Sequence, residues 1–337
     1  MTKSKNQPFP VKEILASASG SDGEAIGSSR QGRPIMAWRL GRGARHVSLI
    51  GGCHADEPIG PAMLEHFIGF LQTRPDHSLL ERFTFFVVPH VNPDGDERNL
   101  SWWRQATETV PLGPYLRDAV REPPGDDVEF GFPHDADDHD ARPENRAVAR
   151  FLEGGAPFML HATFHGMAWG MGPWYLIEES WIDRSRGFRD RLRARSRDLG
   201  YRLHDVDRGG DKGFTRIDEG FTTRPDSRAM RAFFLAQDDP EMAVKFRPSS
   251  MEYVRGLGGD PFTFVTEMPL FILPVERYRE SSDPVRPLAT QRLRAAAVDD
   301  DTLAKVVDEV GLQAMPIRDQ MTLQLAILEE ALDLVAD

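Results

Sequence analysis

Residues 49–67 read LIGGCHADEPIGPAMLEHF. An apolar run ends in two glycines, His54 and Glu57 follow three residues apart, and a helical pattern begins at Pro58. A strand that turns through glycine into a helix predicts an α/β unit, and strand ends in open α/β sheets line ligand crevices. A histidine and a glutamate are also usual ligands of zinc. The position of this pair therefore favours a functional role.

The pair alone is weak evidence for a metal site. A glutamate at the start of a helix also stabilises the helix macrodipole, and the histidine could be an ordinary surface residue. Cys53 is the only cysteine of the chain, so an intramolecular disulfide and a cysteine zinc knuckle are both excluded. Any metal site in this chain has to be built from histidine and carboxylate side chains.

Strand and helix patterns alternate on both sides of this unit. Strands are predicted at residues 35–40, 46–51, 83–91, 157–164, 173–179 and 261–267, the first two as neighbours across a turn, and helices at 58–72, 142–154 and 182–200. Strands that are apolar throughout indicate a largely parallel or mixed sheet covered on both faces. We expect one domain over residues 1–280, followed by a helical extension over 281–337 that packs on it or mediates homo-oligomerisation.

The overall composition excludes several classes of function. A net charge of -12 argues against a nucleic-acid-binding surface, which needs a positive face. No apolar run approaches the roughly 18 residues that would span a bilayer, so we expect no membrane role. The N-terminal segment lacks the apolar core of a signal peptide. These features predict a cytoplasmic protein with small or cationic partners.

Several short motifs occur in an order that resembles the carboxypeptidase A-like zinc metallopeptidase family. They are IGSSRQGRPI, GGCHADEP, NPDG, WWR, RPENRAVARFL, FHG and FTFVTEMP. The resemblance covers residues 25–275 and implies a single α/β domain with a twisted, mixed, eight-stranded sheet flanked by helices. It also implies a zinc-dependent hydrolase that cleaves a peptide or amide bond in a peptide or an amino-acid-derived small substrate.

The resemblance implies a set of three zinc ligands. His54 and Glu57 match the first two. The third is expected at the end of the strand after the PEN helix, where His161 and His165 are both available on one strand face. We choose His165 because Gly166 follows it, as in the family's His-Gly pair. His161 would then be buried in mid-strand as a core histidine.

The resemblance also implies catalytic roles for two further residues. Glu267, at the end of an apolar strand, matches the general base that takes a proton from water and delivers it to the leaving amine. Arg104, in the WWR motif, matches the arginine that polarises the scissile carbonyl and stabilises the oxyanion. Tyr253 lies near the position of the family's mobile active-site tyrosine, although its spacing to the following glycines differs by one.

The sequence departs from the family where the terminal carboxylate of the substrate is bound. DVEFGFP, residues 127–133, places Glu129 and Phe130 where the family has an asparagine and an arginine. A glutamate and a phenylalanine cannot form a bidentate carboxylate clamp. We therefore expect a non-standard specificity for a cationic or neutral group, for example in cell-wall-type peptides that contain a diamino acid. A substrate carboxylate could still be held by the loop arginines Arg216, Arg224 or Arg255.

Two alternatives to a peptidase remain open. The first is an N-acyl amino acid deacylase of the aspartoacylase-like type, although the NPDG and TEMP motifs favour the peptidase branch. The second is a non-catalytic zinc-binding module that has lost turnover. Retention of all three ligand types together with Glu267 argues against the module, whereas the missing asparagine-arginine pair argues for it.

Overall fold

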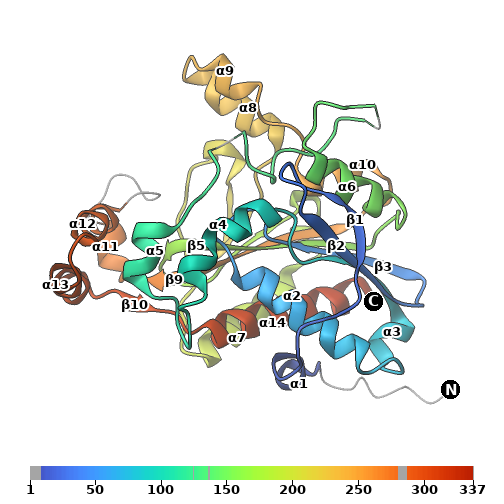
Figure 1. The fold of residues 1–337 in the computed structure, drawn as a ribbon, viewed down its shortest axis with the longest axis horizontal. Coiled ribbons are helices and arrows are strands. Elements are labelled where there is room, and N and C mark those ends of the chain that lie inside the picture. Colours follow the sequence, from blue (N-terminus) through green and yellow to red (C-terminus); the bar gives the residue numbers. More distant parts are fainter. Residues whose placement is uncertain (1–8, 124, 136, 280–286, 337) are drawn as a thin grey trace.

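A mixed β-sheet forms the centre of the computed structural model, which describes residues 9–123, 125–135, 137–279 and 287–336 (Figure 1). Its strand order is β1-β2-β4-β3-β5-β9-β6-β8-β7, and β10 pairs with β9. The strands are β1 (Glu24–Ser28), β2 (Pro34–Gly41), β3 (Arg45–Gly51), β4 (Phe83–Val88), β5 (Leu160–Gly170), β6 (Trp174–Ile177), β7 (Arg216–Asp218), β8 (Phe221–Thr223), β9 (Phe262–Ile272) and β10 (Gln313–Ala314).

Helices cover this sheet on both faces. They are α1 (Val11–Leu15), α2 (Ile59–Gln72), α3 (Ser78–Arg82), α4 (Pro93–Trp103), α5 (Leu112–Asp118), α6 (Pro143–Glu153), α7 (Arg186–Asp198), α8 (Ser227–Ala236), α9 (Pro240–Ala243), α10 (Ser250–Gly256), α11 (Val275–Arg279), α12 (Leu288–Ala296), α13 (Asp300–Val310) and α14 (Ile317–Ala336), with short 3-10 turns at η1 (Glu179–Trp181) and η2 (Asp211–Gly213). Helices α2 and α14 pack against the sheet with α1 and α7 beside them. Helix α6 contacts β1 and α10 contacts β5, and buried residues of these two helices belong to a second apolar cluster.

The central strands are parallel and buried on both sides. β3 pairs in parallel with β4 and β5, and β5 pairs in parallel with β9. Phe85 belongs to one apolar cluster and its neighbour Phe86 to the other, because consecutive strand residues point to opposite faces. The central strands lack apolar-polar alternation because both of their faces are covered, as predicted. The expected mixed α/β fold is confirmed.

Two details of the predicted sheet are wrong. The strands expected to be neighbours, β2 and β3, are separated by β4, which pairs antiparallel with β2 and parallel with β3. The helical crossover from β3 returns the chain beside β3, so β4 takes the position that a hairpin would have taken. The described sheet also has ten strands where eight were expected. Its shortest members, such as β7 and β10, have two or three residues, too few to show a periodicity.

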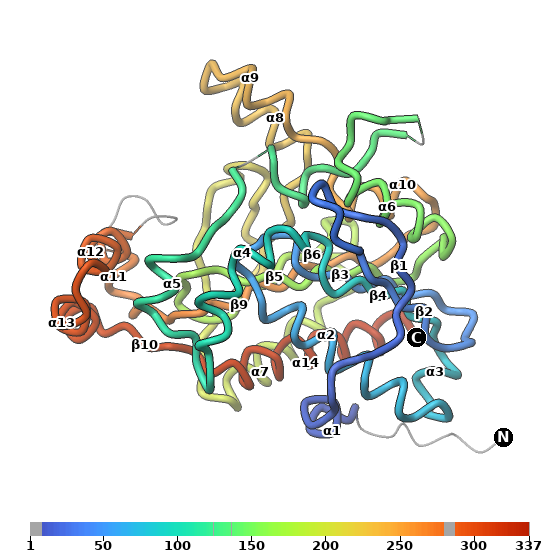
Figure 2. The backbone as a smooth tube through the Cα atoms, viewed as in Figure 1, coloured from blue at the N-terminus to red at the C-terminus, as the bar shows by residue number. Residues whose placement is uncertain are grey.

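The last helix, α14, belongs to the main core. Its fully buried side chains include Leu323, Ile327 and Leu328, which join the same apolar cluster as residues of α2 and the central strands. Figure 2 shows α14 running along the sheet beside α7 and α2. Across the α7 contact, Arg195 lies 2.7 Å from Glu329, so the arginine-rich helix has carboxylate partners.

The predicted division after residue 280 falls outside the described residues. On its C-terminal side, β10 adds to β9 and α14 fills the core, so these elements are part of the same domain. The suggested role in oligomerisation stays a prediction. Within the described chain, no helix has both the length and the apolar character needed to cross a membrane.

Candidate metal centre and active site

His54 and Glu57 lie in a tight loop between β3 and α2. Gly52 turns the chain away from the strand with a φ of 68°, a conformation that glycine adopts at little cost. Gly60, in the first turn of α2, lies so close to β5 that an added Cβ would stand 2.3 Å from the carbonyl oxygen of Phe164. This close approach brings the loop and its carboxylate against β5.

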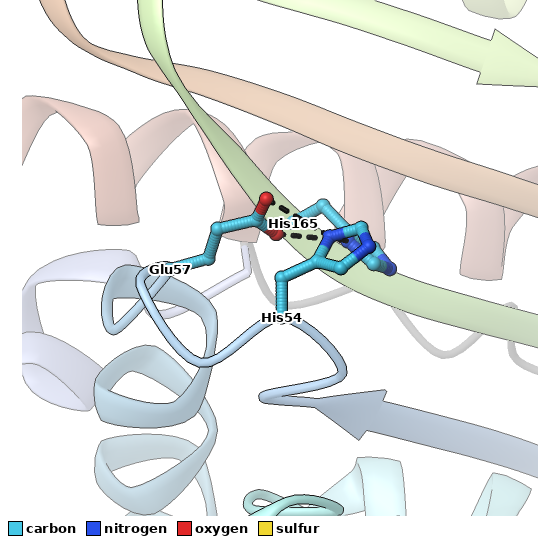
Figure 3. A group of neighbouring side chains, drawn as sticks. All are labelled: His54, Glu57 and His165. Atoms are coloured by element: carbon cyan, nitrogen blue, oxygen red, sulfur yellow. Dashed lines mark hydrogen bonds and ion pairs between the residues drawn. The ribbon is translucent and has the colours of Figure 1, made fainter. Parts of the chain in front are cut away.

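The side chains of His54, Glu57 and His165 converge on one point (Figure 3). His54 Nδ1 lies 2.9 Å from Glu57 Oε1, and His165 Nδ1 lies 2.9 Å from Glu57 Oε2. The two Nδ1 atoms are 3.1 Å apart, and all three residues are buried. The pairing of β3 with β5 ends at Gly51 and Phe164, so the next residue of β5 is left beside the loop.

This set of donor atoms fits a zinc ion. Ligand atoms at about 2.1 Å around a tetrahedral zinc lie roughly 3.4 Å apart, close to the separations found here. Two imidazole nitrogens and a carboxylate oxygen that face one another also suit a shared cation, which all three can bind through their lone pairs. Three protein ligands with room for a fourth group is the arrangement of a catalytic zinc site. The choice of His165 as third ligand is confirmed.

Glu129 supports the metal centre from the outer side. Its Oε2 lies 3.0 Å from Nε2 of His54, the ring nitrogen that faces away from the triad. A carboxylate that accepts the Nε2 proton leaves Nδ1 for the metal and fixes the ring orientation. Burial would raise the pKa of Glu129, yet the imidazoles of His165 and His54 outweigh it and hold this pKa at about 2. Glu129 is therefore ionised and already engaged.

Arg121 brings a cation into contact with the triad. Its Nη1 lies 2.9 Å from Oε1 of Glu57 and 3.3 Å from Oδ1 of Asp56. The hydroxyl of Tyr115 donates to Oδ2 of the same aspartate at 3.3 Å. These contacts hold the guanidinium beside the metal centre, where it can stabilise negative charge that develops on a substrate oxygen.

Glu267 lies directly opposite His165 in the parallel pair of β5 and β9. It lines the same cavity as Arg121. Burial, assisted by the negative charges of Glu57 and Glu129, raises the pKa of Glu267 well above its usual range. A carboxyl group with a raised pKa at a metal centre suits proton transfer near neutral pH. Both strands continue past this point, so neither residue is at a strand end as the sequence suggested.

A cavity of about 360 Å³ opens beside the metal centre. Its size is typical of a site for a small molecule or a single side chain. Its charged lining residues are Arg121, Glu122, Asp127, Glu129, Arg208, Lys212, Arg224 and Glu267. Its apolar lining includes Phe130, Leu176, Phe214, Phe246, Met251 and Val265. The cavity is therefore apolar along its walls and carries both signs of charge.

The predicted substrate-binding residues divide into two groups. Glu129, Phe130 and Arg224 line the cavity. Arg216 lies instead at the surface, where its Nε and Nη2 contact the two carboxylate oxygens of Asp205 at 2.8 and 3.0 Å. Its guanidinium is thus committed to a partner away from the metal centre.

Tyr253 and Arg255 are also outside the residues that line this cavity. Tyr253 donates to Glu153 on α6 and packs its ring against Phe132. Arg255 pairs with Glu178 at 3.5 Å. Both lie on α10, whose side chains at these positions turn toward α6 and the start of β9.

The arginine in contact with the triad is Arg121, whereas the family resemblance implies Arg104. Arg104 is the exposed residue that ends α4. Trp102, two residues earlier, is fully buried, so the helix is anchored by its tryptophan and the arginine faces solvent. Sequence reasoning missed Arg121, whose one signal is that it is the last arginine before the segment at 127–133.

Comparison with known proteins gives a consistent result. A family model described as zinc carboxypeptidase matches residues 21–178. Inactive metallocarboxypeptidase ECM14 of Ajellomyces capsulatus is 32% identical over 118 residues, which cover 30% of this chain and 20% of that protein. Zinc carboxypeptidase A 1 of Anopheles gambiae is 39% identical over 74 residues, which cover 20% of this chain and 17% of that protein. The chain thus spans about a fifth of the length of these curated relatives.

A solved structure shares the fold over nearly the whole chain. Bovine thrombin-activatable fibrinolysis inhibitor, in complex with tick carboxypeptidase inhibitor, matches with a TM-score of 0.50 and 14% identity. The match covers 97% of this chain and 93% of that one. At this identity the likeness establishes the fold alone.

Proposed function

Residues 21–178 match the zinc carboxypeptidase family, and we propose that the chain is a zinc-dependent hydrolase of a peptide or amide bond. The observation that supports this most is the convergence of His54, Glu57 and His165 opposite Glu267. The family match over part of the chain supports the class of protein, and this geometry supports a reaction in which a metal ion and Glu267 act on water. The substrate is a peptide or a small amino-acid derivative.

The residues around the triad have separate tasks in such a reaction. When bound, zinc polarises a carbonyl group and lowers the pKa of water. Glu267 takes the proton of the attacking water and returns it to the leaving amine. Arg121 donates N–H groups to the carbonyl oxygen as negative charge develops there. Glu129 keeps the ring of His54 in the orientation that ligation requires.

The specificity is proposed to be non-standard. Glu129 and Phe130 stand where the family's asparagine-arginine clamp is expected, and neither can bind a carboxylate in a bidentate manner. The ionised carboxylate of Glu129 directs Oε2 to Nε2 of His54 at 3.0 Å, so this oxygen is engaged with a metal ligand and not with the substrate. Any carboxylate of the substrate has to be bound by another residue of the cavity.

A non-catalytic zinc-binding module is the second candidate. It is favoured by the relatives at about 32% identity, which are named inactive metallocarboxypeptidases, and by the altered segment at Glu129. The full ligand set and the placement of Glu267 favour a hydrolase. A direct experiment can separate the two.

The test combines metal analysis with four proteins: wild type, Glu267→Gln, His165→Gln and His161→Gln. We expect about one zinc per chain in all except His165→Gln, since only that variant loses a ligand. Hydrolysis of a panel of peptides and N-acyl amino acids should fall by roughly 10²- to 10⁴-fold in Glu267→Gln, as for loss of a general base. His161→Gln is the matched control, because it changes the other histidine of the same strand.

The outcomes distinguish the candidates. Bound zinc without any hydrolysis that depends on Glu267 would favour the binding module. Cleavage restricted to N-acyl amino acids would identify a deacylase. Loss of zinc from His161→Gln with retention in His165→Gln would contradict the assigned ligand set.

A further inference from the structure

The cavity follows one face of the sheet away from the metal centre. His165 and Glu267 are paired across β5 and β9, and two residues earlier Thr163 is paired with Val265. Residues two apart in a strand share a face, so all four side chains point to the same side. Thr163, Val265 and Glu267 all line the cavity. Its floor therefore runs back along these strands from the metal ligands.

Arg224 lies at the inner end of this floor. Its Nε donates to Oγ1 of Thr263 at 3.2 Å, and Thr263 is the next residue of β9 on the same face after Val265. Thr263 lies four positions before Glu267 on β9, a distance of about 13 Å at about 3.3 Å per residue. Arg224 is only 8% exposed, yet it lines the cavity.

Glu178 holds the guanidinium in place. Its Oε2 accepts from Nη2 of Arg224 at 2.7 Å and from the hydroxyl of Thr263 at 3.1 Å. The same carboxylate lies 3.5 Å from Nε of Arg255, so one negative charge serves two arginines. Asp260 lies 3.8 Å from Nη1 of Arg255 and 2.7 Å from Nη2 of Arg184, so the cluster has three arginines and two carboxylates. Its net charge is positive, and the contacts with Glu178 and Thr263 fix the orientation of the Arg224 guanidinium.

The surroundings of this charge select the kind of group that can reach it. Between the metal centre and Arg224 the walls are apolar, with Leu176, Val265 and Met251 on one side. The hydroxyl groups that line the cavity belong to Thr163, Ser249 and Ser250, and that of Ser250 is bonded to Nε2 of His161. A ligand that fits has an apolar stem and a hydrogen-bonding, negatively charged tip.

We propose that Arg224 determines specificity by binding an acidic side chain of the substrate residue next to the scissile bond. The substrate class is a peptide or amide with a glutamate-like residue at that position. This inference rests on the proposed function and names its substrate. It differs from the expectation of a cationic group, which relied on a free Glu129. A guanidinium and a carboxylate form charge-assisted, bidentate hydrogen bonds. A substrate with a neutral side chain would bind less tightly, because it offers the buried guanidinium no charged partner.

The test uses the zinc-loaded, full-length protein and N-acetyl dipeptides that differ only in the second residue, which is glutamate, glutamine, lysine or leucine. We expect kcat/KM for glutamate to exceed that for glutamine by roughly tenfold or more, the value of a hydrogen bond to a charged group. Arg224→Gln should bring this ratio to about one, whereas Arg224→Lys should retain part of it. Arg216→Gln, which removes a surface arginine paired with Asp205, is the matched control and should leave the ratio unchanged.

Equilibrium binding separates this inference from the proposed function. The same dipeptides are titrated calorimetrically into zinc-loaded Glu267→Gln, with and without Arg224→Gln. A binding preference for the glutamate dipeptide that depends on Arg224, together with no hydrolysis of any dipeptide by the wild-type protein, supports the specificity and rejects the hydrolase. Hydrolysis with equal rates for glutamate and glutamine rejects the specificity and keeps the hydrolase.

Two other results would overturn the inference. One is a wild-type preference for lysine, which would assign the pocket charge to Glu129. The other is a glutamate preference that survives in Arg224→Gln. Arg224→Gln is not needed if loss of the contact with Glu178 prevents its folding. In that case the glutamate-to-glutamine ratio of kcat/KM in the wild type, and its decrease in Arg224→Lys, test the inference.

Discussion

The two histidines of β5 differ in what their ring nitrogens contact. Nδ1 of His161 lies 2.6 Å from the hydroxyl oxygen of Ser48, and Nε2 lies 2.9 Å from that of Ser250. Both nitrogens are satisfied by hydroxyl groups, so this residue serves the core as a neutral imidazole. His165 faces a histidine and a carboxylate instead. Four residues apart on one strand face, the pair shows that neighbours and not residue type decide the role.

The neutral state of His161 predicts a pH dependence of stability. Burial, followed by the charge of Arg224, lowers the pKa of His161 to about 3, against about 6.5 in the unfolded chain. The folded-state pKa is depressed, so the unfolded chain binds the extra proton. The stabilisation is complete above pH 6.5 and is lost as the pH falls toward 3, by about 1.4 kcal/mol per pH unit.

The measurement is urea unfolding of wild type and His161→Gln between pH 7 and 4, with chelator present throughout so that metal release adds nothing. The free energy of unfolding should fall less steeply with decreasing pH in the variant, since the carboxylates titrate in both proteins. Equal slopes would mean that His161 is protonated in the fold.

Two segments of the chain each carry a candidate for the active-site arginine. The exposed Arg104 directly follows α4, whereas the segment after α5 brings Arg121 to Glu57. The second segment is held by Asp56 and Tyr115, which come from the metal-binding loop and from α5. The contact therefore depends on how α5 packs over the loop.

Substitution of the two arginines tests this assignment. We expect Arg121→Gln to lower kcat by roughly 10²- to 10³-fold, the effect of removing an oxyanion donor. Arg104→Gln is the matched control and should leave kcat within about twofold, because an exposed side chain contributes little. Zinc content is measured in both variants, since Arg121 also contacts a metal ligand. A large loss in Arg104→Gln with normal activity in Arg121→Gln would reverse the assignment.

At the scale of the whole molecule, the C-terminal helix and the metal centre share one core. Gln324 of α14 donates to the carbonyl oxygen of His165 at 3.4 Å and to Oγ1 of Thr266 at 3.3 Å. The helix thus touches the backbone of the strand that carries a metal ligand. An extension that merely packed on the outside would not reach this position.

A cavity in α14 should therefore destabilise the complete domain. Leu328→Ala removes a fully buried side chain and should lower the free energy of unfolding by about 2–5 kcal/mol. All six tryptophans precede residue 280, so their fluorescence reports on the remainder of the domain. We expect the urea midpoint of this signal to fall in the variant.

Asp333→Ala, at an exposed position of the same helix, is the control and should change stability by less than about 0.5 kcal/mol. A tryptophan transition that is unchanged in Leu328→Ala would show that α14 unfolds separately from the sheet.

The class of fold could be predicted from sequence patterns, and the metal ligands from the resemblance to the zinc metallopeptidases. The alternation of apolar strands and amphipathic helices is local, and so is the spacing of His54 and Glu57. The motif order was sufficient to add His165 and Glu267. These features could be predicted because each depends on a short stretch of chain that carries its own pattern.

The side chains that meet at the site could be identified only from the folded chain. Arg121 replaced Arg104, Glu129 turned to His54, Arg224 alone of the three loop arginines reached the cavity, and β4 separated β2 from β3. Each of these contacts joins segments that are distant in sequence or follow irregular loops without periodicity. Their geometry is set by packing against the completed sheet, and no local pattern records it.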